Sequence, residues 1–151
     1  MNTAVIVLAV VALAASNLPT IHALRYSVHT TKVTFYEALV QCSDKGGLLA
    51  SPETPTQNEQ IWKAIKTAGT VGTYWIAGSD AGLEGSWIWV TSNRPVGSLN
   101  GYVNWDANEP NNAWPGPPTA VENCLSIFDG KPKWNDVPCD KLYNYVCQHP
   151  Y

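Results

Sequence analysis

Three short groups of oxygen-bearing side chains lie in the second half of the sequence, and together they offer ligands for a hard cation. In order they are Glu109-Pro110-Asn111, Glu122-Asn123-Cys124 and Trp134-Asn135-Asp136. Ca²⁺ takes six to eight oxygen ligands from carboxylates, amide carbonyls and water. The candidate ligands are carboxylates and amides: Glu109, Asn111, Glu122, Asn135 and Asp136. Their total negative charge is larger in magnitude than the positive charge of the ion, so the composition predicts a calcium site. The alternative is that Asn, Asp and Pro simply mark turns.

Residues that would indicate catalysis are scarce. His29 and His149, the histidines beyond the N-terminal segment, lie near the two ends of the chain. No Ser/His/Asp arrangement is visible in the sequence, and no carboxylate pair stands apart from the candidate calcium ligands. Asp136 and Glu122 could act as an acid and a base, but a calcium role explains them better. We therefore do not expect this protein to be an enzyme.

The N-terminal segment has the pattern of a secretory signal. Residues 5–15 form an unbroken apolar run, whereas a membrane-spanning helix needs roughly 20 residues. We predict a signal peptide over residues 1–23, cut near Ala23, and one domain over residues 24–151. No Lys or Arg precedes the run, and a buried core helix is the alternative. No later stretch is apolar enough to insert in a membrane, so a secreted, extracellular protein is expected.

The cysteines and the net charge limit the chemistry further. Four cysteines behind a signal peptide predict two disulfides, and three pairings are open from the sequence alone. None of the Cys/His spacings of a zinc site is present. The formal charge of −3 has the wrong sign for a protein that binds a phosphate backbone, and the basic residues are scattered. We therefore expect no nucleic-acid partner.

Two helices are predicted in the first half of the mature chain. Thr34 and Glu37 form a capping-box pattern before apolar residues at helical spacing, and Gly46-Gly47 ends that helix. Thr56 and Glu59 form a second capping-box pattern, which predicts the start of another helix. Its expected apolar face and C-terminal cap are Ile61, Ala64, Ile65, Ala68 and Gly69.

The remaining pattern favours strands and one long loop. The β-rich runs cover residues 26–28, 74–77, 87–90, 125–128 and 143–146. Between Val90 and Cys124 lies a polar stretch rich in Asn, Gly and Pro, and a loop of this length in a compact domain is usually functional or disordered. Its tryptophans and its end at a cysteine favour the functional interpretation. The sequence therefore predicts an α+β domain.

The order of these motifs is recognisable. The landmarks are the Cys42 helix, Trp75-Ile76-Ala77-Gly78, Gly85-Ser86-Trp87-Ile88-Trp89, Asn104-Trp105, the three groups described above, Cys139 and Tyr145-Val146-Cys147. In this order they resemble the C-type lectin-like domain over almost the whole mature chain. The short form is indicated, because no further cysteine pair precedes Cys42.

The resemblance implies a fold of two helices, antiparallel β-sheets and a long irregular calcium-binding loop. It implies the disulfides Cys42–Cys147 and Cys124–Cys139. It also implies that Trp75, with Trp87 or Trp89, lies in the core and does not serve as a sugar platform, which is the general expectation for rings in apolar runs.

In sugar-binding members of this family, the Glu-Pro-Asn and Trp-Asn-Asp triplets jointly hold one calcium ion. The resemblance thus implies the ligand set Glu109, Asn111, Glu122, Asn135 and Asp136, with a cis peptide before Pro110. Two adjacent sugar hydroxyls would complete the calcium shell, donate to the carboxylates and accept from the amides. The family associates Glu-Pro-Asn with equatorial 3- and 4-hydroxyls, as in mannose, N-acetylglucosamine and fucose-like arrangements, and Gln-Pro-Asp with galactose.

The sequence departs from the family pattern in two places. Residues 112–121 exceed the common spacing and contain Trp114, which either stacks on a sugar or packs to hold the loop in place. If this loop moved Glu122 away, the site would lose a carboxylate. A second calcium site, common in the family, is matched by acids at only two positions, so its occupancy is a weak expectation. Its candidate ligands are Asp80, Glu84, Asn112 and Asn123.

The leading functional hypothesis is a secreted, calcium-dependent lectin for mannose-type glycans on cell or microbial surfaces, with a role in pattern recognition or host interaction. The alternative is a C-type lectin-like domain that binds a protein or lipid surface without sugar. Relatives of that kind have usually lost the two triplets that this chain keeps. A contact through two hydroxyls predicts affinity on the order of millimolar, so useful binding needs several copies.

Overall fold

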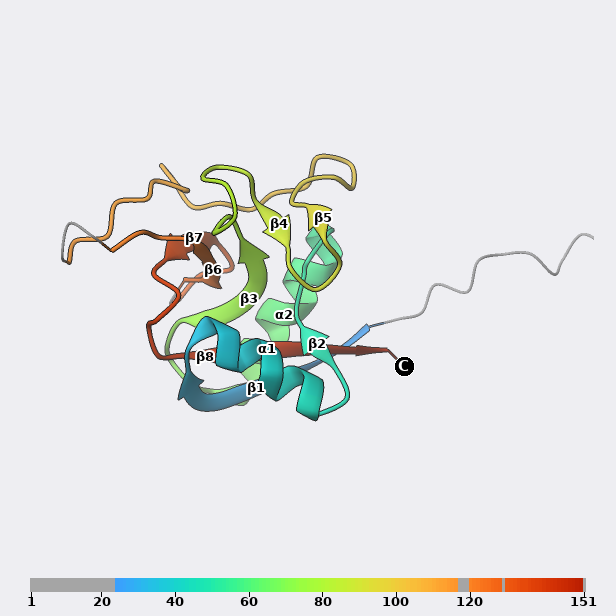
Figure 1. Cartoon of the computed structure of the whole chain (residues 1–151). Coiled ribbons are helices and arrows are strands. Elements are labelled where there is room, and N and C mark those ends of the chain that lie inside the picture. The colour runs from blue at the N-terminus through green and yellow to red at the C-terminus, as the bar shows by residue number, and fades with distance from the viewer. Residues whose placement is uncertain (1–23, 117–119, 129, 151) are drawn as a thin grey trace, which may run out of the picture.

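The computed structural model describes residues 24–116, 120–128 and 130–150 (Figure 1). The predicted signal peptide, residues 1–23, lies outside this part. The helices are α1 (Phe35–Asp44) and α2 (Pro55–Ala68). The strands are β1 (Leu24–Val33), β2 (Leu48–Leu49), β3 (Tyr74–Ser79), β4 (Ile88–Trp89), β5 (Arg94–Pro95), β6 (Cys124–Ile127), β7 (Trp134–Val137) and β8 (Tyr143–Pro150). Neither helix in the described part is long and apolar enough to cross a membrane.

Helix α1 begins at the predicted capping box. The Thr34 side chain accepts from the Glu37 amide, and the Glu37 carboxylate accepts from the Thr34 amide at 2.8 Å. The residues that α1 buries, Phe35, Ala38 and Cys42, follow the helical period. Gly46 adopts a φ of 71° just beyond the C-cap, where a residue with a Cβ atom would be strained.

Helix α2 begins two residues earlier than predicted. Its N-cap is Thr54, whose hydroxyl accepts from the Gln57 amide at 3.2 Å, and the capping box predicted at Thr56 is wrong. Thr54 is extended and Pro55 follows it, an arrangement that suits the first turn because proline has no amide hydrogen to satisfy there. The predicted cap at Gly69 is confirmed by its φ of 67°.

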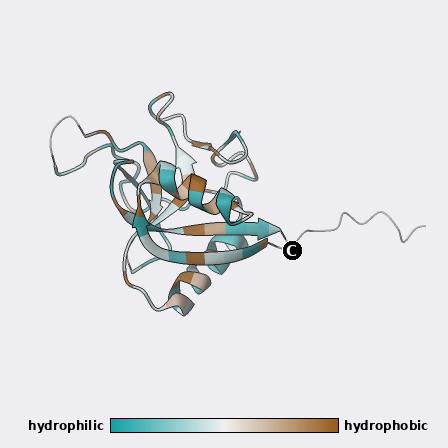
Figure 2. Cartoon of the chain, turned by 60° about the horizontal axis from the view of Figure 1, so that its bottom comes forward, coloured by the Kyte–Doolittle hydropathy of each residue, from teal (hydrophilic) through white to brown (hydrophobic). Residues whose placement is uncertain are grey.

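The strands form one branched sheet in the order β1-β8-β3-β4-β5, with β2 on β8 and with β6 between β3 and β7. Among the described strands the pairings are antiparallel except that of β3 with β8, which is parallel. The α+β class is confirmed, but three strands were not predicted: β2, β5 and β7. The long strands carry both hydrophilic and hydrophobic stretches (Figure 2), without strict alternation, and β3 is buried along its whole length.

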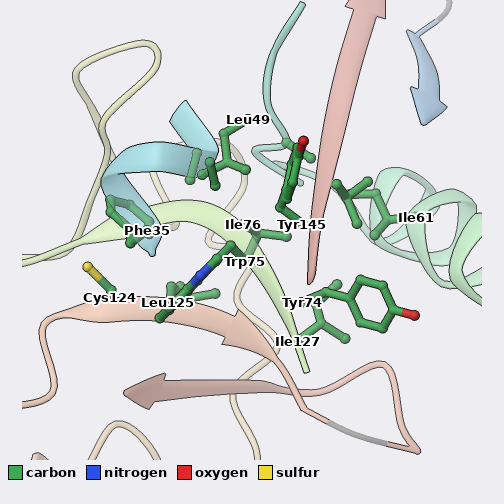
Figure 3. Close-up of a cluster of buried hydrophobic side chains, with 14 of the residues drawn as sticks. Phe35, Leu49, Ile61, Tyr74, Trp75, Ile76, Cys124, Leu125, Ile127 and Tyr145 are labelled. Atoms are coloured by element: carbon green, nitrogen blue, oxygen red, sulfur yellow. The ribbon is translucent and has the colours of Figure 1, made fainter. Parts of the chain in front are cut away.

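The core lies between the helices and strands β3, β6 and β8 (Figure 3). Trp75 is completely buried in it, and its indole N–H donates to the Val33 carbonyl at 2.9 Å. Trp89 is also buried, whereas Trp87 remains half-exposed. The structure thus confirms Trp75 as a core ring and selects Trp89 as the second.

Both implied disulfides are present. Cys42–Cys147 joins α1 to β8, and Cys124–Cys139 joins the start of β6 to the segment after β7. The segment between β5 and β6 is irregular, as predicted, and lies at the end of the molecule opposite the β1–β8 pair (Figure 1). Asn100, Asn108 and Asn112 adopt positive φ angles in this loop, a conformation that Asn tolerates better than most residues.

Candidate functional site

The Glu109-Pro110-Asn111 group lies in the long loop, and backbone contacts hold this loop against β7. Trp105 forms a parallel bridge with Trp134, in which the Asp106 amide donates to the Trp134 carbonyl at 2.8 Å. The Glu109–Pro110 peptide is cis, as the resemblance implied. The triplet is therefore positioned beside the strand that begins with the Trp-Asn-Asp group.

Strands β6 and β7 position the other predicted ligands. Asp136 is 1% exposed and pairs with Leu125 of β6, while Asn135 is half-buried and pairs with Ser126. Glu122, which is 4% exposed, lies two residues before β6. Glu122, just before β6, and Asn135 and Asp136, within β7, thus lie at the edge of the sheet that faces the long loop.

Hydrogen bonds join the loop to β7 at this edge. The Asp136 carboxylate accepts from the Asn111 amide at 3.2 Å and from the Asn112 amide at 2.8 Å. The Asn111 side-chain oxygen accepts from the Ala113 amide at 2.7 Å. Asp136 therefore anchors the backbone that presents Asn111.

The carboxylates at this edge lie close enough to repel one another. Burial, a hydrogen bond with the Asp136 carboxyl group and the neighbouring acidic charges raise the pKa of Glu109 to about 7. Burial and the charge of Asp136 also raise the pKa of Glu122. The structure thus brings Glu109, Glu122 and Asp136 into one acidic cluster, and a cation at this point would relieve their repulsion.

The donor atoms fit a calcium ion that uses amide as well as carboxylate oxygens. Glu109 Oε2 is buried and has no hydrogen-bond partner within the described part of the chain. Across the same residues, no three His, Cys, Asp or Glu side chains gather closely enough to hold a metal by themselves. A metal here would need further oxygen ligands, for which the sequence predicts the amides of Asn111 and Asn135, and an all-oxygen set suits calcium better than zinc or copper.

The residues predicted for a second calcium site also meet. Glu84 accepts from the Asn112 side-chain amide at 2.9 Å, and Asp80 accepts from the Gly85 amide at 2.7 Å. Asp80 Oδ1 and Asn123 Oδ1 are buried and lack hydrogen-bond partners among the described residues. Burial and nearby acidic charge, including that of Asp136, raise the pKa of both Asp80 and Glu84. The charge of Asp136 therefore acts on members of both groups of candidate ligands.

Trp114 packs against the domain. Its ring contacts the hydrophobic core, and the Lys141 ammonium lies 4.9 Å from the ring centroid. The loop that contains it is closed at its base, because the Glu122 amide donates to the Asn112 side-chain oxygen at 2.8 Å. Glu122 thus remains beside the other candidate ligands despite the long spacing. Residues 117–119 lie outside the described part.

Two positioning residues were not found from the sequence. Asn58 of α2 accepts from the Trp134 indole at 2.8 Å and donates to the Pro132 carbonyl at 3.0 Å. Asn104 donates to the same carbonyl and accepts from Lys133 at 2.9 Å. These contacts fix the start of β7, and the only signal in the sequence was Asn104 within the Asn104-Trp105 motif.

Comparisons with known proteins bear on the family and the fold of the chain. The family model described as the Lectin C-type domain matches residues 31–149. C-type lectin domain family 4 member K of Homo sapiens is 34% identical over 119 residues, which are 78% of this chain and 33% of that protein. Perlucin of Haliotis laevigata is 30% identical over 125 residues, which are 82% of this chain and 74% of that protein. The chain thus spans only about a third of the first of these relatives.

Solved structures give the same assignment. The carbohydrate-recognition domain of a mouse scavenger receptor C-type lectin superimposes with a TM-score of 0.71 at 27% identity, over 84% of this chain and 90% of that one. A calcium-independent type II antifreeze protein superimposes with a TM-score of 0.68 at 25% identity, over 87% and 90% of the two chains. The family model covers most of the sequence. The fold, the disulfides and the order of the motifs agree with it, and this chain therefore belongs to the C-type lectin domain family.

Proposed function

We propose that this chain is a secreted, calcium-dependent carbohydrate-binding protein that recognises mannose-type sugars. The observation that supports this most directly is the cluster of Glu109, Glu122 and Asp136, in which a buried Glu109 oxygen has no partner among the described residues. Asn111 adjoins the cluster through its backbone amide, which donates to Asp136, and Asn135 directly precedes Asp136 in β7. A site of this kind alternates acceptors and donors, as a pair of sugar hydroxyls requires.

The proposed calcium ligands are Glu109, Asn111, Glu122, Asn135 and Asp136. The ion would supply a positive charge and open coordination positions for sugar oxygens. Glu109 and Glu122 would accept hydrogen bonds from the sugar hydroxyls, and the amides of Asn111 and Asn135 would donate to them. The order of acid and amide in Glu-Pro-Asn favours equatorial 3- and 4-hydroxyls by resemblance to the family. No residue is assigned a catalytic role.

A second calcium ion is proposed for Asp80, Glu84, Asn112 and Asn123. The unpaired oxygens of Asp80 and Asn123 within the described part support it. Its ligands would be poorer in charge than those of the first site, because two of the four side chains are amides. This ion would stabilise the loop and would not contact the sugar.

Retention on mannan-agarose tests the proposal, because a multivalent matrix compensates for weak monovalent affinity. The mature chain should bind in calcium and elute with EDTA or mannose, while galactose should leave it bound. The variant Glu109→Gln/Asn111→Asp should lose mannose binding or shift toward galactose. The variant Glu59→Gln, an exposed change on α2, serves as the control. If the folded chain binds neither mannan nor a broader glycan panel, the proposed lectin mechanism is refuted.

The alternative is a domain that binds a protein or lipid surface without sugar. The similarity to a calcium-independent antifreeze protein supports considering it, because the same fold there works without the metal. Calcium titration separates the two functions. A chain that binds no calcium and no glycan would favour the alternative.

A further inference from the structure

The two histidines that lie near opposite ends of the sequence meet on one face of the sheet. Strands β1 and β8 pair antiparallel, with Ser27 opposite Cys147 and His29 opposite Tyr145. His149 lies two residues beyond Cys147, so its side chain is on the same face as Ser27 and within reach of it along the diagonal. His149 and Ser27 are 122 residues apart in the chain, and no local spacing motif could reveal their contact.

Both imidazole rings point to a single oxygen atom. The Ser27 Oγ atom lies 3.0 Å from His29 Nε2 and 2.9 Å from His149 Nε2. A hydroxyl can donate to one of these nitrogens and accept from the N–H of the other, so neutral rings need different tautomers here. The two Nε2 atoms therefore converge on one point, as the nitrogen ligands of a single metal ion do.

Packing fixes the direction of each ring. His29 stacks on the Tyr145 ring, with the centroids 4.8 Å apart and an angle of 17° between the planes. His149 is 8% exposed and fills the space beside Gly47, where a Cβ atom would lie 2.6 Å from the Nδ1 and Cε1 atoms of the ring. The Nε2 atom of each ring is left to face Ser27, so little ordering is needed before an ion binds.

The cluster offers nitrogen and hydroxyl ligands but no carboxylate. His29 and Ser27 are half-buried, so an ion can approach from their side. The Lys45 ammonium lies 5.9 Å from the centroid of the Tyr145 ring, and its charge acts on His29. Calcium prefers several carboxylate or carbonyl oxygens and is poorly served by these surroundings, whereas zinc and copper bind neutral imidazole nitrogen.

We infer that His29, His149 and Ser27 form a site for a transition-metal dication of the zinc type. The two Nε2 atoms are its nitrogen ligands, and the Ser27 hydroxyl or water completes a tetrahedral shell. Zinc–nitrogen distances are about 2.0–2.1 Å, so the rings must come closer together than in the hydrogen-bonded cluster, a change that the half-buried His29 accommodates. The site lies on the β1–β8 pair, at the end of the molecule opposite the long loop (Figure 1). A bound ion joins these two strands.

Calorimetric titration of Zn²⁺ into the mature chain tests the site, at about pH 7.5 and with calcium in excess to compete for the acidic cluster. Both imidazoles are neutral at this pH, which is above the ordinary histidine pKa of about 6.5. His29→Gln should raise the dissociation constant at least about tenfold, because even groups that only orient metal ligands are worth about 10–100-fold. The matched control is Thr30→Gln, which places the same side chain at an exposed position on the opposite face of β1. It should leave the zinc affinity unchanged.

Nuclear magnetic resonance of the imidazole nitrogens gives a second measurement that needs no substitution. The predicted mature chain, residues 24–151, contains no histidine besides His29 and His149. One equivalent of zinc should shift the Nε2 signals of both rings, and calcium should shift neither.

The outcomes separate this site from the proposed lectin function. Zinc binding that His29→Gln leaves intact, or a shift in only one of the two histidines, overturns the two-histidine site. Zinc binding that is lost in Glu109→Gln/Asn111→Asp but kept in His29→Gln places the ion in the acidic cluster and also overturns it. If zinc does not bind, this inference fails and the calcium and mannan predictions stand unchanged.

Discussion

Replacing Asn58 with alanine tests whether α2 fixes the strand that carries the Trp-Asn-Asp group. Asn58 is 3% exposed and bonds through both ends of its side-chain amide. Its oxygen accepts from the Trp134 indole at 2.8 Å, and its nitrogen donates to the Pro132 carbonyl at 3.0 Å. Alanine removes both contacts and leaves the buried indole N–H without this acceptor.

The expected loss follows from what each partner retains. The Pro132 carbonyl still accepts from the Asn104 side chain, so its loss is small. The Trp134 N–H is buried with a completely buried ring, and leaving such a donor unpaired costs about 1–3 kcal/mol. We expect Asn58→Ala to lower the free energy of unfolding by about 2 kcal/mol, a large part of the roughly 5–15 kcal/mol that stabilises a typical domain.

Urea unfolding of the calcium-free protein, followed by circular dichroism, measures this loss without a contribution from the ion. The matched control is Gln60→Ala, an exposed position on the same helix, which should change the free energy by less than about 0.5 kcal/mol. A loss in Asn58→Ala no larger than that of the control would refute the assignment of Asn58 as the support of β7.

Three further predictions follow from packing, charge and metal binding. Gly78→Ala should cost about 1–3 kcal/mol, because a Cβ atom there would lie 2.6 Å from Leu125, whereas Gly82→Ala, with open space around it, should be neutral in the same urea assay. Burial and the Lys45 cation lower the pKa of His29 below 6.5, so the unfolded chain binds more protons than the folded one below that pH. The free energy of unfolding should therefore fall as the pH drops below about 6.5 and level off beneath the lowered pKa, and His29→Asn should remove this component of urea curves measured across that range. Calcium at a hundred times its Kd should raise the stability by about 2.7 kcal/mol, and a Tm that calcium leaves unchanged would contradict the proposed metal site.

The sequence predicted the helices better than the strands, because the contacts that start and end a helix are made by residues close together in the chain. The capping box at Thr34 acts within one turn, so the start of α1 could be predicted without tertiary information. At α2 the capping-box pattern at Thr56 predicted the wrong start, because the structure caps the helix with Thr54, which Pro55 follows at the first helical position. Strands β2 and β5 contain two residues each, too few for any period to appear.

Strand β7 was missed for a different reason. Asn135 and Asp136 are poor strand formers, and they were interpreted only as loop ligands. They are extended because β6 pairs with them along the whole strand, which is a tertiary constraint that overrides local preference. The three groups of the candidate site could be noticed from their oxygen-bearing side chains, and the resemblance implied that they act together. Their convergence, however, depends on contacts such as that between Asn58 and Trp134, which are 76 residues apart.

Asn112 shows how a departure from the family pattern can have a structural role. It stands where an acidic residue is usual, and this substitution suggested only a weaker second calcium site. In the structure its side-chain nitrogen donates to Glu84 and its oxygen accepts from the Glu122 amide, while its own amide donates to Asp136. A carboxylate could accept but could not donate to Glu84, so the amide alone can join both groups of candidate ligands. The same residue closes the loop of residues 112–121 at its base, and the position of Glu122 is therefore set by this contact and not by the length of the loop.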